Sequence, residues 1–188
     1  MVKDFQEIIS ADGAKASLTA AFVFAYMTFH LGSVFLSGMC IILIASSFPV
    51  TAIITEGIFG ITYFGDVHNI IIFIIMGVAA DDIFVFVDAW RQSASIPELE
   101  NDLYKRMYYT FRRAFRAMAV TSSTTSVAFF SNLLSPLMPI KSFGLFAGVI
   151  IPVNFLLVIT FLPSYIIIHE KNLIFKNVKH CQKKENKI

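Results

Sequence analysis

The chain has 188 residues, of which 56% are hydrophobic and only 15% are charged, and its mean hydropathy is +0.71. Average soluble domains contain roughly 45–50% apolar and about 25% charged residues, so this composition cannot build a water-facing surface. It excludes a disordered chain, a secreted disulfide scaffold and a nucleic-acid-binding globule. A net charge of +2 indicates no strong global field, and two cysteines are too few for a disulfide framework. We therefore predict an all-α polytopic membrane protein.

Stretches without formal charge predict five transmembrane helices, since each span needs about 20 residues. Residues 16–55 carry no formal charge and are too long for one span, so the cluster 30–33 is expected to divide them. Pro136 and Pro139 mark the turn between the last two spans. The expected spans are about 14–30, 34–55, 67–87, 117–135 and 142–168, which together form one five-helix membrane domain over residues 14–168.

The distribution of positive charge predicts the orientation. Twelve of the 15 Lys and Arg residues lie either between the third and fourth spans or after the fifth. With five spans these two segments share one face, which the positive-inside rule makes cytoplasmic. The N-terminus is then extracytoplasmic with only a short segment before the first span, which indicates a fragment of a larger protein. Residues 1–13 are expected to end a missing extracellular region, and 169–188 to form a basic cytoplasmic tail.

Residues 95–116 are expected to form a separate amphipathic helix lying flat on the cytoplasmic leaflet. Ser95 and Glu98 have the spacing of a capping box, and an arginine cluster suits the C-terminal end of the helix dipole. Large apolar residues recur every four positions, which is typical of an interfacial helix. They are Leu99, Leu103, Met107, Phe111 and Phe115.

Two adjacent acids, Asp81 and Asp82, stand inside the third predicted span. If the helix enters at Val67, Asp81 lies about 21 Å along it, well inside a hydrocarbon core of about 30 Å. A carboxylate there costs at least about 2.5–3.5 kcal/mol on insertion scales, so a proton, a cation or a partner must offset it. Gly77 and Ala80 are small enough for close helix contact. The sequence therefore predicts a proton- or sodium-coupling site; the alternative is that the span ends before Asp81 and both acids lie in water.

Hydroxyl side chains at the start of the fourth span are candidates for lining an ion path beside these acids. The candidate residues are Thr121, Ser122, Thr124 and Thr125, within a longer run over 121–126. The alternative is that each hydroxyl bonds the backbone of its own helix, as is common in membranes. The sequence alone leaves these two interpretations open.

The remaining features are expected to be structural. Asp88, Trp90 and Arg91 form an interfacial group in which Asp88 is expected to pair with Arg91. Gly144 and Gly148 form a helix-contact motif, and Asn154 is a candidate for a hydrogen bond across helices. The four histidines have no metal-ligand spacing, and the chain lacks a nucleophile elbow or a phosphate loop. We predict no enzyme, no metal and no cofactor beyond a coupling proton or sodium ion.

Two segments resemble the Dispatched branch of the Patched/Dispatched family, within the resistance-nodulation-division (RND) transporter superfamily. They are GVAADDIFVFVDAWRQS at 77–93 and residues 117–171, and the similarity extends over about 14–171. The resemblance implies a sterol-sensing domain that comprises helices two to six of one transporter half. It maps the family's GxxxD(D) motif onto Gly77, Asp81 and Asp82, where family members are thought to couple cation movement to export.

The resemblance implies a fragment of a cation-coupled transporter that moves sterols, lipids or lipid-modified proteins. Its partners would be a membrane lipid or sterol and the missing second transporter half or another membrane protein, with no nucleic acid. The membrane would be the plasma membrane or an endomembrane. The alternative is a non-transporting sterol-sensing module that regulates or recruits a partner. A third hypothesis is a non-functional truncated gene product.

Overall fold

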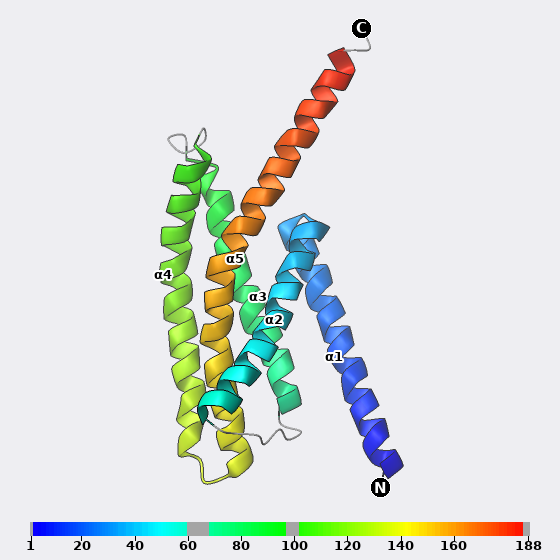
Figure 1. The fold of residues 1–188 in the computed structure, drawn as a ribbon, viewed down its shortest axis with the longest axis vertical. Helices are drawn as coiled ribbons and strands as arrows, with labels where there is room; N and C mark the ends of the chain where they lie inside the picture. The colour runs from blue at the N-terminus through cyan, green and yellow to red at the C-terminus, as the bar shows by residue number, and fades with distance from the viewer. Residues whose placement is uncertain (1, 60–67, 97–101, 186–188) are drawn as a thin grey trace.

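The computed structural model describes the backbone of residues 2–59, 68–96 and 102–185, and the side chains of 17–57, 71–96 and 102–170. These residues form an all-helical protein (Figure 1). The α-helices are α1 (Val2–Leu31), α2 (Val34–Phe59), α3 (His68–Ser93), α4 (Leu103–Phe130) and α5 (Met138–Glu185), with a short 3-10 helix η1 (Ser131–Leu134) after α4.

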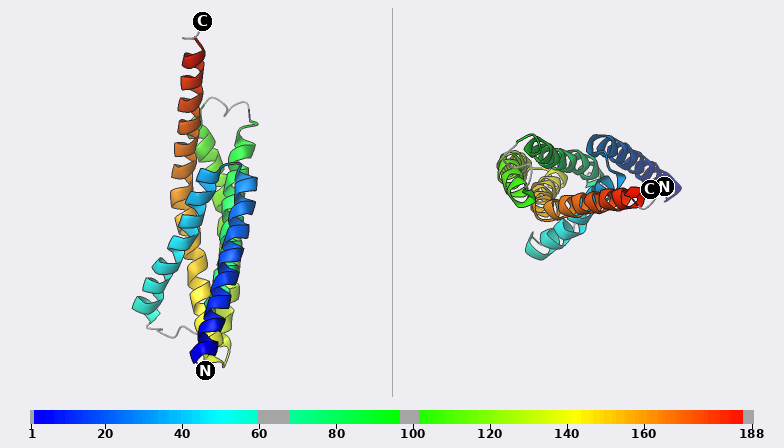
Figure 2. Two further views of the ribbon diagram at one scale, coloured as in Figure 1. Left: turned by 90° about the vertical axis from the view of Figure 1, so that its right-hand side faces the viewer. Right: turned by 90° about the horizontal axis from the view of Figure 1, so that it is seen from above.

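Successive helices run in opposite directions along one long axis, so the two ends of the chain lie at opposite ends of the molecule (Figures 1 and 2). The long helix α5 contacts α2, α3 and α4, and it extends beyond them at its C-terminal end. Helix α1 contacts only α2 and α3 among the described helices, and its N-terminal end splays away from the bundle in Figure 1.

The break between α1 and α2 falls at Gly32 and Ser33. Gly32 has a φ of 69°, in the left-handed region that favours glycine. Its N–H donates to the carbonyl of Thr28 at 2.9 Å, which closes the last turn of α1. The Ser33 hydroxyl then accepts from the N–H of Leu36 at 3.4 Å, so α2 begins with a side-chain cap.

Helix α4 corrects the prediction of a separate helix at 95–116 followed by a span at 117–135. The described part is one continuous helix that begins at Leu103, and Ser95 lies in a turn where its hydroxyl donates to the carbonyl of Gln92 at 2.8 Å. Glu98 and Leu99 lie outside the described residues. The buried face of α4 runs unbroken from the predicted interfacial part into the predicted span, through Thr110, Ala114, Met118, Ser122 and Ser126. Residues 103–116 therefore pack against the bundle as the first half of α4.

Asp102 is the N-cap of α4 in place of Ser95. Its Oδ1 accepts the backbone N–H groups of Lys105, at 3.2 Å, and Tyr104, at 3.0 Å. The hydrogen bond from Lys105, followed by smaller contributions that include Tyr104, lowers the pKa of Asp102 below its ordinary value. The N-terminus of α4 is thus held by a charge-assisted cap.

Other helix bounds also differ from the predicted spans. Helix α1 includes most of the segment expected to end an extracellular region, α3 extends past Val87 to Ser93, and α5 continues past Ile168 through the predicted tail to Glu185. Among the described residues, two helical stretches are long and apolar enough to cross a membrane, Val34–Gly57 and Met138–Glu170. Ser17–Leu31 is a shorter apolar stretch. Five spans remain a prediction, because α3 and α4 carry too many polar side chains to be recognised by length and composition.

The hydrophobic core lies where α3 and α5 meet their neighbours. Phe86 and Ile83 on α3, Met118 on α4 and Ile150 on α5 are fully buried, with 0% exposure. Large apolar side chains also cover the outside of the bundle, and Phe29, which is 90% exposed, is one of them. Exposed apolar area of this extent marks an interaction or membrane surface.

Candidate functional site

Asp82 lies near the midpoint of α3 and is buried in the bundle, with only 4% of its surface exposed. The hydroxyl of Ser122 on α4 donates to its Oδ2 at 3.4 Å, which is a long hydrogen bond. No cationic side chain lies within ion-pair distance of this carboxylate among the described residues. A buried carboxylate with one neutral donor is a costly arrangement that a structural role alone does not explain.

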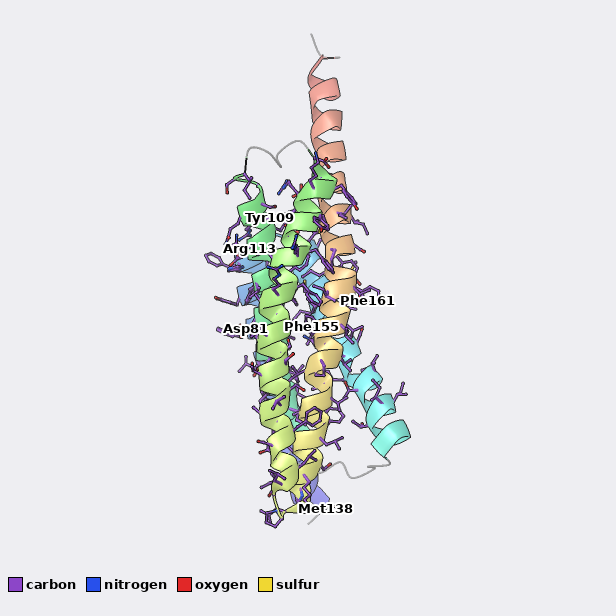
Figure 3. All side chains as sticks on the ribbon, turned by 90° about the vertical axis from the view of Figure 1, so that its left-hand side faces the viewer. Asp81, Tyr109, Arg113, Met138, Phe155 and Phe161 are labelled. Carbon is purple, nitrogen blue, oxygen red and sulfur yellow. The ribbon has the colours of Figure 1, made fainter. Side chains whose placement is uncertain are left out.

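Asp81 faces the outside of the bundle instead, because neighbouring residues on a helix point about 100° apart. It shares an exposed face of α3 with Gly77 and with Val85, which is 39% exposed. Figure 3 shows Asp81 at the side of the bundle at the level of Phe155 on α5. The two acids therefore present one carboxylate to the interior and one to the surroundings.

Gly77 does not make the close helix contact that was predicted for it within the described part of the chain. A Cβ added at Gly77 would meet no atom within 4 Å. Ala80, by contrast, is buried with 5% exposure. The exposed face around Gly77 leaves room for another helix to approach closely.

The candidate hydroxyls divide into one that reaches α3 and three that do not. Thr121 donates to the carbonyls of Ala117 and Met118, and Thr124 and Thr125 likewise donate to carbonyls of their own helix. Ser122 alone among the four bonds Asp82. A fifth hydroxyl, Ser126, belongs to the same run over 121–126. It donates to the carbonyl of Gly148 on α5 at 2.6 Å, so it joins α4 to α5.

Gly144 and Gly148 lie where α5 packs on the end of α4. A Cβ at Gly144 would lie 2.5 Å from the Cβ of Asn132 and 2.7 Å from the carbonyl oxygen of Phe129. A Cβ at Gly148 would lie 2.7 Å from the ring of Phe130. Gly144 is required because backbone at the end of α4 lies too close for a Cβ, whereas at Gly148 the close atoms belong to the Phe130 side chain.

The predicted pairing of Asp88 with Arg91 is wrong. Arg91 Nη2 donates instead to the carbonyl of His30 on α1, and Asp88 Oδ1 lies 3.9 Å from Nε2 of the same histidine. The end of α1 supplies both partners because it packs beside the end of α3. This part of α3 is therefore tied to α1.

Trp90, which is predicted to lie at the membrane interface, is buried within the bundle, with 6% exposure. The guanidinium of Arg106 on α4 stacks over the Trp90 ring, with the Arg106 Cζ 4.2 Å from the ring centroid. The indole Nε1 of Trp90 donates to Oε1 of Glu170 on α5 at 3.3 Å. Arg106 also donates to the hydroxyl of Ser93 and the carbonyl of Trp90, each at 3.4 Å. Sequence spacing gave no signal for Arg106 or Glu170, because both contacts join helices that are distant in the chain.

Two further features of the bundle are an apolar groove and a buried asparagine. An apolar groove of about 440 Å³ lies between Ala20 on α1, Ile41 and Phe48 on α2, and Ile72 and Met76 on α3. Asn154 is buried in α5, and among the described residues its side-chain amide has no hydrogen-bond partner, so the predicted bond across helices does not form within this part of the chain. The part of the chain that the structure describes holds no cluster of three His, Cys, Asp or Glu residues suited to a metal ion.

Comparison with known proteins finds one family model and several relatives. The model described as the sterol-sensing domain of SREBP cleavage-activation matches residues 18–185. Protein dispatched homolog 1 of Mus musculus is 32% identical over 181 residues, which are 96% of this chain and 12% of the mouse protein. Protein dispatched of Drosophila melanogaster is 30% identical over 188 residues, with 89% of this chain and 15% of the fly protein covered.

A shorter match reaches higher identity. Protein dispatched homolog 3 of Homo sapiens is 34% identical over 132 residues, which are 70% of this chain and 9% of the human protein. The chain thus spans between 9% and 15% of the length of these three relatives. The aligned region includes the helices that carry the buried acid and its hydroxyl partner, since the mouse match covers nearly the whole chain.

Proposed function

This chain is a membrane protein of the sterol-sensing-domain family and a Dispatched-like member of the Patched/RND group, and we propose that it is the membrane core of a cation-coupled transporter. The cargo would be a sterol, a lipid or a lipid-modified protein. Five helices would cross the membrane, with the N-terminus extracytoplasmic and the C-terminus cytoplasmic, in the plasma membrane or an endomembrane. The observation that carries the proposal is the burial of Asp82 near the midpoint of α3.

Asp82 would be the group that takes up the coupling proton or sodium ion. Its only hydrogen-bond donor among the described side chains is Ser122, and that contact is 3.4 Å long. An ionised carboxylate in hydrocarbon costs about 2.5–3.5 kcal/mol or more, and a bound proton or cation removes that cost. Because Ser122 lies on α4, loading and unloading the site would strengthen or weaken the contact between α3 and α4.

Asp81 and Gly77 would face a second group of membrane helices rather than this bundle. Both lie on the exposed face of α3, and a Cβ at Gly77 meets no atom within 4 Å. An exposed carboxylate in hydrocarbon is as costly as a buried one, so a partner helix with polar groups would have to cover it. The second half of a transporter, or another membrane protein, fits this role.

The apolar groove between α1, α2 and α3 is our candidate for the cargo or a sterol. Its lining, which includes Ile41, Phe48 and Met76, offers almost no polar atoms. Its volume of about 440 Å³ lies in the range of small-molecule sites, about 300–1,000 Å³. A rigid apolar molecule, such as a sterol ring system, suits such a surface.

The test is export by the assembled transporter with Asp82→Asn, Asp81→Asn and the matched control Asp88→Asn. We expect Asp82→Asn to abolish export while the protein still reaches the membrane, because an amide cannot take up a proton or balance a cation. Asp88 contacts His30 at the end of the bundle, so its substitution is expected to leave export unchanged. Normal export with Asp82→Asn would refute the coupling role.

The alternative, a non-transporting sterol-sensing module, predicts a different pattern. Labelling by a photoreactive sterol would be saturable in the groove, and the aspartate substitutions would be tolerated. Substituting Met76 with Trp would fill the groove and is expected to reduce labelling under either hypothesis. Export with Asp82→Asn is therefore the measurement that separates the two.

A further inference from the structure

The outward face of α4 carries three arginines that the proposed transport cycle does not use. Arg112, Arg113 and Arg116 are exposed, and together with Tyr109 they line a shallow depression of about 360 Å³. Figure 3 shows Tyr109 and Arg113 on α4, nearer the C-terminal end of the molecule than Asp81. These side chains form a single basic patch, which we call the α4 arginine patch.

The patch has no counter-charge within the described part of the chain. The ion pairs between described residues join His30 to Asp88 and Lys105 to Asp102, and neither includes a patch arginine. The one polar contact within the patch is from Arg113 Nη1 to the Tyr109 hydroxyl at 3.3 Å. Three guanidinium groups are therefore free to bind an external anion, and their planar donors match phosphate geometry.

The position of the patch along α4 points to the source of that anion. Arg116 and Arg112 lie six and ten residues before Ser122, or about 9 and about 15 Å along the helix from the Asp82–Ser122 contact. Half of a hydrocarbon core is about 15 Å. If Asp82 lies near the midplane, as the proposed function requires, the long arginine side chains reach the phosphate level of the leaflet.

An apolar groove lies beside the patch on the same half of α4. It has a volume of about 460 Å³ and is lined by Leu103, Met107, Tyr108, Phe111 and, from α5, Ile167. Tyr108 and Phe111 are 61% and 39% exposed. Tyr108 lies one helical turn before Arg112, so the groove lies farther than the patch from Ser122, at the headgroup level or beyond it, and the patch alone is placed to hold a lipid.

We propose that the α4 arginine patch binds the phosphate of an anionic phospholipid from the cytoplasmic leaflet. This rests on the proposed membrane arrangement of α4, and it assigns the patch a ligand separate from the transport cargo. The lipid would hold the first half of α4 upright in the leaflet. Lipid binding to an upright α4 explains the arginine cluster in place of the flat-lying helix that the sequence predicts.

The test uses the purified 188-residue chain in mixed micelles of detergent, phosphatidylcholine and phosphatidylserine, with retained lipid quantified by mass spectrometry. The variant is the triple substitution Arg112→Gln, Arg113→Gln and Arg116→Gln. The matched control removes three cations from the tail, as Lys179→Gln, Lys183→Gln and Lys184→Gln. A charge-assisted hydrogen bond to phosphate contributes at least about a tenfold factor in binding, so loss of two or more of them in the patch variant should lower phosphatidylserine retention on the order of a hundredfold. The tail variant should retain it.

Equal loss in the two triple variants would overturn the proposal, because it would show attraction by net charge alone. Displacement of phosphatidylserine by inorganic phosphate at low concentration would also overturn it, by identifying a free anion as the ligand. A triple Arg→Lys variant keeps the charge and must recover most of the binding, whatever the effect of Gln on folding. Asp82→Asn should leave lipid retention unchanged, so failure of the coupling role and failure of the lipid site are distinguishable.

Discussion

Gly144 is the position where a single added methyl group should most clearly disturb the bundle. In Gly144→Ala the new Cβ would lie 2.5 Å from the Asn132 Cβ and 2.7 Å from the carbonyl oxygen of Phe129. Favourable carbon contacts lie at about 3.5–4.0 Å, so α5 and the end of α4 would have to separate by about 1 Å. One of the two clashing atoms is backbone, which cannot rotate away as a side chain can.

The expected loss of stability follows from two opposing effects. Overpacking a well-packed interior costs typically about 1–3 kcal/mol, while Ala gains about 1 kcal/mol over Gly from helix propensity. Because backbone must move at Gly144, we expect the upper part of the range and a net loss of about 1–2 kcal/mol. For a chain of this length each kcal/mol lowers Tm by about 2–4 °C, which gives a fall of about 2–8 °C.

The assay is thermal unfolding of the purified chain in detergent, followed by the fluorescence of Trp90, which is the single tryptophan. Trp90 reports on the bundle because it is buried and contacts both α4 and α5. Gly77→Ala is the matched control, since its Cβ meets no atom within 4 Å, and its Tm should be unchanged or higher. Equal stability of the Gly144 and Gly77 variants would refute the close packing of α5 on α4.

Three further substitutions test the contacts around the site. Ser122→Ala leaves the buried carboxylate of Asp82 without its described donor and should lower the free energy of unfolding by about 1–3 kcal/mol. The control Thr121→Ala loses only bonds to its own helix and should change the free energy of unfolding by under about 0.5 kcal/mol. Arg106→Ala removes the contact over Trp90 and should cost about 0.5–2 kcal/mol, with a red shift of the tryptophan emission; an unshifted spectrum would argue against the stacked geometry. Asp102 has a lowered pKa, so its contribution to stability is present above its unfolded pKa of about 3.9 and is lost as the pH falls through the still lower folded pKa. The protection factors of the amides in the first turn of α4 should therefore fall in acid, and Asp102→Asn, which can still cap, should remove that pH dependence. Equal acid sensitivity of the protection factors in the variant would contradict the assignment.

The sequence predicts best the features that depend on local chemistry. Gly32 and Ser33 interrupt the first apolar stretch because one adopts a positive φ and the other caps the next helix. Pro136 lies in the turn before α5, where its missing N–H is harmless. These residues determine local geometry whatever packs around them, so their effect can be recognised without a tertiary structure.

The start and the course of α4 could not be predicted in the same way. Ser95 with Glu98 and Asp102 with its following residues are both plausible caps, and only the extent of α3 to Ser93 excludes the first. The polarity of the chain also changes near residue 117, which suggests two segments. The buried face passes through that change because small and polar side chains such as Ala114 and Ser126 pack as well against α3 and α5 as large apolar ones would.

The different environments of Asp81 and Asp82 also depend on neighbours distant in the chain. Helix geometry predicts that the two point about 100° apart, but only the packing of α4 against α3 determines that Asp82 is the buried one. The same argument explains the error at Arg91, where a partner was sought three residues away and the carbonyl of His30 on α1 was nearer. The two acids are consequently not interchangeable: replacing Asp82 acts on the contact between α3 and α4, whereas replacing Asp81 changes the exposed face of α3 and leaves the bond from Ser122 in place.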